Sequence, residues 1–266
     1  MNVIVCIKQV PDPEEPGARY KVDPQAKRVI LPREVPLVIN PYDEQALEAA
    51  LRVKEQCGGK ITVISVGDTS AVRAVRKALA MGADEGILIS DEAFEGSDSF
   101  SIAHILEKAI QEIGVYDLIL CGRQAADTDA GVVGSVIAEN LGISIITFAK
   151  KIEALDGMFR VERIVSDGYE VIEVRPPAVV TVSNEIGQPR LPSGWGIMAA
   201  VKKEIPTWKA HDLRIDTSRM GHAADRSELV ELYIPVQERK CQIIMGENAE
   251  EAAGKLALAL SESGII

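Results

Sequence analysis

The sequence predicts an α/β fold: a doubly wound, mostly parallel sheet with flanking helices, an antiparallel hairpin excursion and an extended C-terminal arm. Through the first two-thirds of the 266 residues, short apolar runs alternate with amphipathic segments of helical period. The short runs are apolar at successive positions, as in strands that helices cover on both faces of a parallel sheet. Two Asp-Gly pairs after residue 143 predict the hairpins.

The alternation starts with a strand at residues 3–7. A helix is expected to begin after Asn40, which can cap it, with Pro41 in its first turn. Asp43 favours the positive end of this helix, and the glycines at 58–59 end it. The remaining elements of this part are strands at 61–66, 86–89 and 118–121 and helices at 69–81, 97–113 and 131–141.

The pattern changes after residue 143. Asp156-Gly157 and Asp167-Gly168 are hairpin signals, so the runs at 148–152, 159–165 and 169–174 are expected to pair antiparallel. The elements expected beyond them are a buried strand at 179–182, a loop leading into a helix or arm at 185–200, an irregular polar stretch at 205–227, and a last helix capped by Asn248 and Glu251.

The bulk composition excludes several classes of protein. A formal net charge of -11 repels phosphate backbones and argues against nucleic-acid binding. No run of about 18 apolar residues suggests a membrane span, and the N-terminus lacks the features of a signal peptide. The four cysteines form no CxxC pair and the three histidines show no ligand spacing. We therefore expect no metal site, a cytoplasmic setting, and Cys6 and Cys121 as buried free thiols.

Residues 118–134 carry the most information about a ligand. They read as a strand, a polar loop and a helix start that contains small residues. Main-chain N–H groups at a helix N-terminus attract phosphate oxygens, and Gly131 and Gly134 permit close approach. Thr128 can donate to a phosphate, and Arg123 can neutralise one. The segment therefore suggests a nucleotide loop, although it contains no GxGxxG or Walker sequence.

Each candidate segment also has a simpler interpretation. Asp127 and Asp129 could cap the helix of an ordinary strand–loop–helix junction, and residues 40–43 could be helix capping alone. Lys8 suits an anionic ligand, but lysines are common at strand ends. Residues 66–68 end another strand. All four segments lie at carboxyl ends of expected parallel strands or just after a crossover, so their convergence favours a ligand site.

The sequence shows no arrangement of nucleophile and base. No serine lies in a G-x-S-x-G frame, and so few histidines argue against a hydrolytic triad. Most carboxylates fall on predicted helix surfaces. This shortage of catalytic groups is expected where a bound cofactor carries the chemistry.

Several stretches occur in the order typical of one known family. They are residues 5–12, 39–48, 78–84, 121–129 with Val133-Gly134, and 189–190 with 197–200. Together they resemble the beta subunit of electron-transfer flavoproteins, which has an adenine-nucleotide alpha-hydrolase-like fold. The resemblance covers roughly residues 1 to 205.

The resemblance implies a nucleotide-binding domain at residues 1–205, with a partner-recognition loop at about 184–200. It also implies a C-terminal arm and helix at 206–266 that pack on a larger alpha subunit carrying FAD. Beta subunits of the housekeeping branch hold AMP as a structural ligand. Those of the bifurcating or confurcating branch hold a second FAD, which takes a hydride from NADH and sends single electrons along two routes. The Gly122-Arg123-Gln124 loop looks more like the FAD-holding branch, so we hypothesise FAD rather than AMP.

Carried over to this sequence, the family's cofactor site lies on strand ends and loops. Its residues are Cys6, Asn40, Pro41, Tyr42, Asp43, Val66, Gly67, Gly122, Arg123, Gln124, Ala125, Asp127, Thr128, Asp129, Ala130, Gly131, Val132, Val133 and Gly134. The family often has Gln where Val132 stands and Pro where Ser135 stands, so one side-chain amide is missing from this site.

The recognition segment departs further from the family. Its implied partner-binding residues are Arg190, Leu191, Gly194, Trp195, Ile197 and Met198. Gly194 replaces the anchoring Leu of the family, with Trp195 beside it. An exposed Trp195 would be an interface anchor, whereas a buried one would cover its own domain. We expect the partner to be a flavin-dependent dehydrogenase, of 2-hydroxy-acid or acyl-CoA type, and the departure at Gly194-Trp195 favours one other than the usual acyl-CoA dehydrogenase.

Two alternatives stay open at this point. The chain could be a structural beta subunit that holds AMP, with all redox chemistry in its partner. It could also be an ATP-binding stress-type module, although such a module should have a Gly-rich phosphate motif and no recognition loop. Flavin content separates the first alternative from bifurcation, and co-purification with a larger flavoprotein subunit separates both from the second.

Overall fold

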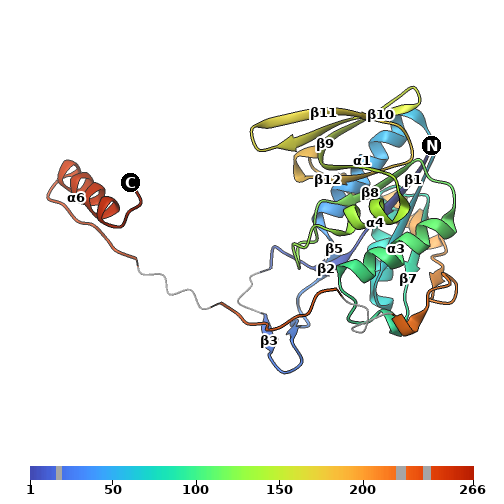
Figure 1. The fold of residues 1–266 in the computed structure, drawn as a ribbon, viewed down its shortest axis with the longest axis horizontal. Coiled ribbons are helices and arrows are strands. Elements are labelled where there is room, and N and C mark those ends of the chain that lie inside the picture. The colour runs from blue at the N-terminus through green and yellow to red at the C-terminus, as the bar shows by residue number, and fades with distance from the viewer. Residues whose placement is uncertain (16–19, 220–225, 236–240) are drawn as a thin grey trace. The chain divides into compact units, whose positions relative to one another are not determined.

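The computed structural model describes residues 1–15, 20–219, 226–235 and 241–266. By their internal contacts they form two units, Met1–Lys21 with Val29–Val230 and Val22–Arg28 with Glu231–Ile266. The first unit carries the central sheet and its covering helices, and the second carries the C-terminal helix (Figure 1). The domain boundary expected at residue 205 stays a prediction.

The bounds of the elements are as follows. The strands are β1 (Asn2–Cys6), β2 (Gln9–Pro11), β3 (Lys21–Asp23), β4 (Arg28–Ile30), β5 (Leu37–Ile39), β6 (Lys60–Val66), β7 (Glu85–Ile89), β8 (Leu118–Gly122), β9 (Ser144–Leu155), β10 (Met158–Val165), β11 (Gly168–Val174), β12 (Ala178–Val182) and β13 (Thr207–Trp208). The helices are α1 (Pro41–Cys57), α2 (Val72–Met81), α3 (Ser99–Ile113), α4 (Val133–Leu141), α5 (Gly194–Lys202) and α6 (Ala249–Glu262).

The central sheet has the strand order β11-β10-β9-β12-β8-β1-β6-β7-β13. Its central strand β1 pairs in parallel with β6 on one side and with β8 on the other. The parallel pairing continues through β7 and β13 on the β6 side, and through β12 and the start of β9 on the β8 side. The chain therefore winds outward from β1 in both directions, which confirms the predicted doubly wound sheet.

Helices cover both faces of this sheet. Val3 and Val5 point into a core shared with α1, α2 and Ala200 of α5. Ile4 points into the opposite core, which holds the apolar faces of α3 and α4. Successive side chains of a strand alternate between faces, so an unbroken apolar strand such as β1 needs both layers of helices.

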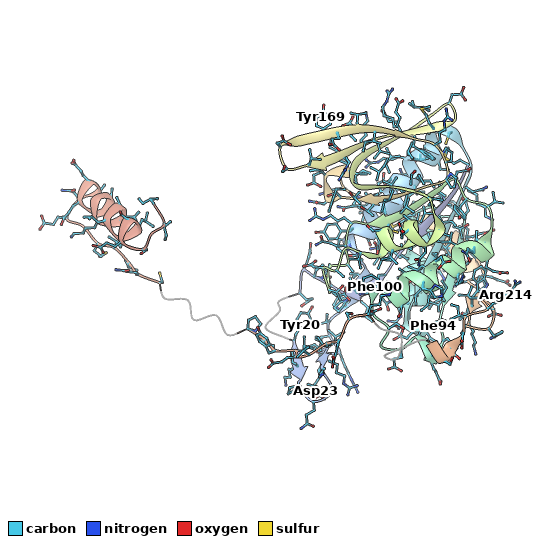
Figure 2. All side chains as sticks on the ribbon, viewed as in Figure 1. Tyr20, Asp23, Phe94, Phe100, Tyr169 and Arg214 are labelled. Carbon is cyan, nitrogen blue, oxygen red and sulfur yellow. The ribbon has the colours of Figure 1, made fainter. Side chains whose placement is uncertain are left out.

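The antiparallel excursion also forms as predicted. Strand β9 first pairs in parallel with β12 and then antiparallel with β10, and β10 pairs antiparallel with β11. Asp156-Gly157 makes the first turn, where Gly157 has a φ of 74°. Tyr169 near the start of β11 lies on this excursion (Figure 2).

The expectation of an irregular polar stretch at 205–227 is partly wrong. Strand β13 pairs with β7, and the following residues Ala210, Leu213 and Ile215 are buried in the α3–α4 core. A strand of two residues is too short to show a period, so the sequence pattern missed it. Two small two-stranded sheets were also not predicted: β2 pairs antiparallel with β5, and β3 pairs with β4.

The last helix has the predicted cap, because the Asn248 side chain accepts a hydrogen bond from the Glu251 N–H at 2.9 Å. The parts of the expected arm at 220–225 and 236–240 lie outside the described residues. Among the helices that are described, none is long and apolar enough to span a bilayer. The same residues include no group of three or more His, Cys, Asp or Glu placed to hold a metal ion.

Candidate functional site

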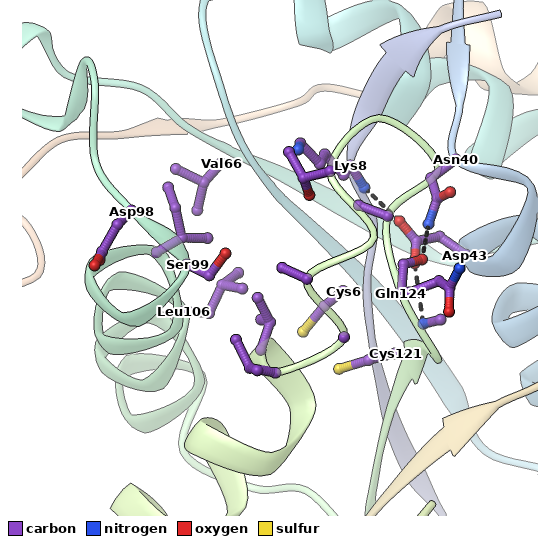
Figure 3. A pocket seen from close by; sticks show the side chains of 18 of the residues that line it. Cys6, Lys8, Asn40, Asp43, Val66, Asp98, Ser99, Leu106, Cys121 and Gln124 are labelled. Atoms are coloured by element: carbon purple, nitrogen blue, oxygen red, sulfur yellow. Dashed lines mark hydrogen bonds between the residues drawn. The ribbon is translucent and has the colours of Figure 1, made fainter. Parts of the chain in front are cut away.

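A cavity of about 490 Å³ opens at the carboxyl edge of the parallel sheet. Val66, Asp98, Ser99 and Leu106 lie on one side of it, and Lys8, Asn40, Asp43 and Gln124 lie on the other (Figure 3). Its lining residues are Cys6, Ile7, Lys8, Asn40, Asp43, Val66, Ser97, Asp98, Ser99, Ile102, Leu106, Cys121, Gly122, Arg123, Gln124, Ala125, Thr128, Ala130, Gly131, Val132, Val133, Ser227 and Leu229.

Topology explains the position of this cavity. The chain leaves β1 toward β6 on one side and later returns to β8 on the other, so the connections after β1 and β8 diverge to opposite faces. Such a point of reversed strand order leaves a crevice beyond the strand ends, where ligands of open α/β sheets bind. Cys6 and Cys121, the neighbouring residues of β1 and β8, form its floor.

Asp43, in the first turn of α1, ties together the ends of the two strands that flank the crevice. Its carboxylate accepts the N–H of Lys8 at 2.7 Å and the N–H of Gly122 at 3.0 Å. Only 6% of Asp43 is exposed. Burial raises its pKa to about 7, although the hydrogen bonds from Lys8, Asn40 and Gly122 oppose that rise.

Asn40 holds the loop after β8 instead of capping its own helix. Its amide nitrogen donates to the carbonyl of Gln124 at 2.8 Å, and its amide oxygen accepts the N–H of Ala126 at 3.0 Å. No side-chain cap hydrogen bond forms at the start of α1. The interpretation of Asn40 as a simple helix cap is therefore wrong, because both polar atoms of the amide are committed to the loop.

The loop from Gly122 into α4 is shaped by its main chain. A Cβ at Gly122 would lie 2.4 Å from an oxygen of Asp43, so only glycine fits there. Asp129 and Gly131 both have positive φ, 52° and 63°, which turns the chain into α4. The N-cap position of α4 is Val132, and no side chain caps this helix. Its first N–H groups therefore start beside the cavity without a side-chain acceptor, as in sites for phosphate groups.

The predicted capping of α4 by Asp127 and Asp129 is wrong. The Asp127 carboxylate pairs with the Lys8 ammonium at 2.7 Å. Asp129 accepts a hydrogen bond from the Gln124 amide at 2.8 Å. Both acidic side chains brace the loop, and neither lines the cavity. The Lys8 ammonium is paired with the Asp127 carboxylate and is therefore already partly neutralised.

Arg123 is held in a fixed position at the rim of the cavity. Its guanidinium lies 5.4 Å from the ring centroid of Tyr42 and 5.5 Å from that of Phe148. It also donates to the Ser183 hydroxyl at 3.3 Å and to the Gln124 side-chain oxygen at 3.1 Å. A guanidinium bound to two aromatic faces keeps its full charge, so the rim carries a fixed cation.

Two buried thiols form the floor of the cavity, and the Cys6 thiol is held neutral. Cys6 and Cys121 are buried, as the sequence predicts. Contact with the Cys121 thiol, together with burial, raises the pKa of Cys6 well above its ordinary value. A neutral thiol is a poor nucleophile and a small apolar surface, so the floor offers packing rather than reactivity.

A second feature lies on α5, apart from the cavity lining. Ser193 caps this helix by accepting the N–H of Gly196 at 3.0 Å. Its outward side carries Trp195, 82% exposed, with Met198 and Val201 also exposed, and Leu191 stands 88% exposed just before it. Contiguous apolar side chains of this size on an open surface indicate an interaction site. Trp195 does not cover its own domain.

Arg190 fastens the segment before α5 to α1. It donates from its main chain and from its guanidinium to Glu48, with the Nε–Oε2 distance at 2.8 Å. Only 4% of Glu48 is exposed. Burial alone would raise the pKa of Glu48, but hydrogen bonds from Arg190 and Arg52 outweigh it and the pKa is lowered. Arg190 thus anchors the exposed segment to α1.

Comparison with known proteins assigns these features to one family. The family model described as "Electron transfer flavoprotein domain" matches residues 28–213. The chain belongs to the electron transfer flavoprotein family. It is 44% identical, over the whole length of both chains, to "Electron transfer flavoprotein subunit beta" of Thermoanaerobacterium thermosaccharolyticum. It is 38% identical over both whole chains to "Caffeyl-CoA reductase-Etf complex subunit CarD" of Acetobacterium woodii, and 32% identical to "Acryloyl-CoA reductase electron transfer subunit gamma" of Anaerotignum propionicum over 94% of this chain and 95% of that one.

The structure gathers most of the expected cofactor residues of this electron transfer flavoprotein chain around the cavity. Those that line it are Cys6, Asn40, Asp43, Val66, Gly122, Arg123, Gln124, Ala125, Thr128, Ala130, Gly131, Val132 and Val133. The other six are not among the lining residues. Pro41 begins α1, Tyr42 faces Arg123, Gly67 donates its N–H to the Ile89 carbonyl, and Gly134 packs on β8 and β12. Asp127 and Asp129 brace the loop through Lys8 and Gln124.

One wall of the cavity was not predicted from the sequence. It is made by Ser97, Asp98, Ser99, Ile102 and Leu106 at the start of α3 and by Ser227 and Leu229. The α3 residues could have been found, because they follow β7, whose neighbour β6 contributes Val66. Ser227 and Leu229 carry no sequence signal of their own, and they follow the last residue of the family match.

Proposed function

We propose that this chain is the beta subunit of a heterodimeric electron transfer flavoprotein that holds FAD in the cavity. In this proposal it pairs with an alpha subunit that carries FAD, and electrons pass between NADH, the alpha-subunit FAD and a partner flavin dehydrogenase, by bifurcation or confurcation. The cavity carries the proposal, because it combines an apolar wall on α3 with the uncapped start of α4. A dinucleotide needs both, an apolar slot for a ring and N–H donors for phosphates.

The residues present suit such a ligand. Ile102, Leu106 and Val66 offer apolar contact to a ring. The main chain around Gly131 and the start of α4 would receive phosphate oxygens, and Arg123 adds a fixed positive charge at the rim. When bound, the flavin would supply the hydride and single-electron chemistry. The protein would orient it, exclude water from it and hold the loop in place through Asn40 and Asp43.

FAD is preferred over AMP for two reasons. The Gly122-Arg123-Gln124 loop resembles the FAD-holding branch. Relatives of similar length carry names that place them in caffeyl-CoA and acryloyl-CoA reductase systems. AMP as a structural ligand is the alternative, and it would use the same phosphate donors while leaving all redox chemistry to the partners.

Anaerobic titration with NADH tests the electron route. The purified heterodimer should lose its visible flavin absorbance on addition of NADH, with part of the loss arising in the beta subunit. A heterodimer whose flavin stays oxidised under excess NADH would contradict the proposal.

The proposed location is the cytoplasm, where free thiols such as the exposed Cys57 persist.

The exposed side of α5 is proposed to receive the partner flavin-dependent dehydrogenase, of 2-hydroxy-acid or acyl-CoA type. Trp195, Met198 and Leu191 would supply the apolar anchors. Trp195→Ala should slow electron delivery to the dehydrogenase about tenfold or more, since buried anchors contribute about 2 kcal/mol or more to binding. The bound nucleotide should be unaffected. Val115→Ala, which removes another exposed apolar side chain, is the control, and an unchanged rate with Trp195→Ala would count against this docking site.

A further inference from the structure

Residues 226–230, here called the strap, pass beside the cavity and supply part of its lining. Ser227 and Leu229 belong to that lining, although they lie beyond the family match, which ends at residue 213. We propose that the strap is part of the nucleotide site: Leu229 closes the apolar end of the cavity over the ring of the bound nucleotide, and Asp98 holds the strap there. This inference rests on the proposed function.

Asp98 makes two separate sets of hydrogen bonds with its two carboxylate oxygens. Oδ1 caps α3 by accepting the N–H groups of Phe100 at 3.1 Å and Ser101 at 2.9 Å. Oδ2 accepts from the strap: the N–H of Arg226 at 2.8 Å, and the N–H and hydroxyl of Ser227, both at 3.1 Å. One side chain therefore joins the cavity wall to the strap.

The charge of Asp98 is maintained by these contacts. Burial opposes the charged form, but the N–H groups of Ser101, Arg226 and Ser227 outweigh it and hold the pKa of Asp98 below its ordinary value. Hydrogen bonds to a charged acceptor are stronger than those between neutral groups. A further contact supports the same placement, because the Arg226 guanidinium lies 5.5 Å from the ring centroid of Phe100, labelled in Figure 2.

The strap meets the cavity at the α3 wall, where Asp98 binds it and where apolar residues follow on the same helix. Ile102 and Leu106 line the cavity from α3, and Val66 lies on the same side as Leu106 in Figure 3. The N–H donors of α4 and the Arg123 cation belong to the loop after β8. A nucleotide bound with its phosphates at α4 places a ring against the α3 wall, where Leu229 adds apolar contact and excludes water.

Asp98→Asn separates the two roles of this residue. Asparagine caps helices as well as aspartate does, so its oxygen preserves the cap of α3. Its NH₂ group cannot accept the strap N–H groups. The wild-type protein and each variant are loaded with FAD, and in parallel with AMP, and release is followed by ultrafiltration after dilution. Release of nucleotide from Asp98→Asn should be faster by about tenfold or more, because hydrogen bonds to a charged group are lost. Leu229→Ala should act in the same direction.

Asp91→Asn is the matched control. Asp91 also caps a short helical turn, at Ala93, and accepts the N–H of Ala210 from the same C-terminal stretch, yet it does not line the cavity. Its nucleotide release should match that of the wild type. Wild-type release rates in both Asp98→Asn and Leu229→Ala would overturn the strap proposal while leaving the proposed function intact. A wild-type protein that binds neither FAD nor AMP would overturn both.

Discussion

Asp43 should make the stability of this protein depend on pH, and Asp43→Asn should abolish that dependence. Only 6% of the Asp43 residue is exposed. Burial raises its pKa from 3.8 to about 7 despite the hydrogen bonds from Lys8, Asn40 and Gly122. A group whose pKa is raised on folding stabilises the fold fully below its unfolded pKa. That contribution is lost as the pH rises through the folded pKa.

The size of the effect follows from the shift. One pKa unit corresponds to about 1.4 kcal/mol, so between pH 5 and pH 8 the Asp43 contribution to the unfolding free energy should fall by about 2–3 kcal/mol. Asparagine does not titrate. As the pH rises from 5 to 8, the unfolding free energy of Asp43→Asn should therefore increase by about 2–3 kcal/mol relative to that of the wild type.

Urea denaturation of both proteins at pH 5, 6, 7 and 8 measures this difference, and all other titrating groups cancel in the comparison. Asp91→Asn is the control, because the pKa of Asp91 is shifted in the opposite direction from that of Asp43. Hydrogen bonds from Ala93 and Ala210 lower the pKa of Asp91, so its stabilisation is lost only as the pH falls below its ordinary pKa. Asp91→Asn should show a constant difference from pH 5 to 8. A constant difference for Asp43→Asn would refute the assignment of Asp43 as the buried titrating group.

Four further substitutions, one of them a control, test the bracing of the cavity and of the segment before α5. Asn40→Ala should weaken nucleotide binding about tenfold or more, measured by isothermal titration, because two hydrogen bonds to the loop are lost. Gly122→Ala should lower the unfolding free energy by about 1–3 kcal/mol, since its Cβ would meet a carboxylate oxygen at 2.4 Å. Gly194→Ala, with nothing within 4 Å, should leave that energy unchanged, and equal effects at the two glycines would contradict the packing. Arg190→Met should cost about 3 kcal/mol in urea denaturation by leaving the buried Glu48 short of a partner, and a cost near zero would show that Arg190 is not an anchor.

The sequence was sufficient to predict the parallel part of the fold because burial on both faces leaves a direct signature. A run such as residues 3–6 is apolar at every position, as in a strand of a sheet that lies between two layers of helices. The hairpins were equally readable, since Asp156-Gly157 supplies the positive φ that a tight turn requires. Strand β13 was not readable, because two residues paired at a sheet edge have no period.

The position of the site was predicted correctly, but the hydrogen-bond and ion-pair partners of some of its side chains were not. Asn40 stands at the N-cap position of α1, and Asp127 precedes α4 by a few residues, so local sequence rules can read both as helix caps. In the structure both make contacts to residues far away in the sequence instead: Asn40 holds the loop after β8, and Asp127 pairs with Lys8. Such long-range partners depend on which strands are neighbours, which residue type alone does not specify. The strap was beyond reach for the same reason, since Asp98 and Ser227 are far apart in sequence.

The nucleotide content of the natively purified heterodimer is the most direct test of whether this chain holds FAD. The nucleotides are released by denaturation, separated, and counted per pair of subunits. We expect two FAD molecules per heterodimer, one of them from the cavity between β1, β8 and α3, and no AMP. One FAD and one AMP per heterodimer would contradict it and would make this chain a structural, AMP-holding subunit.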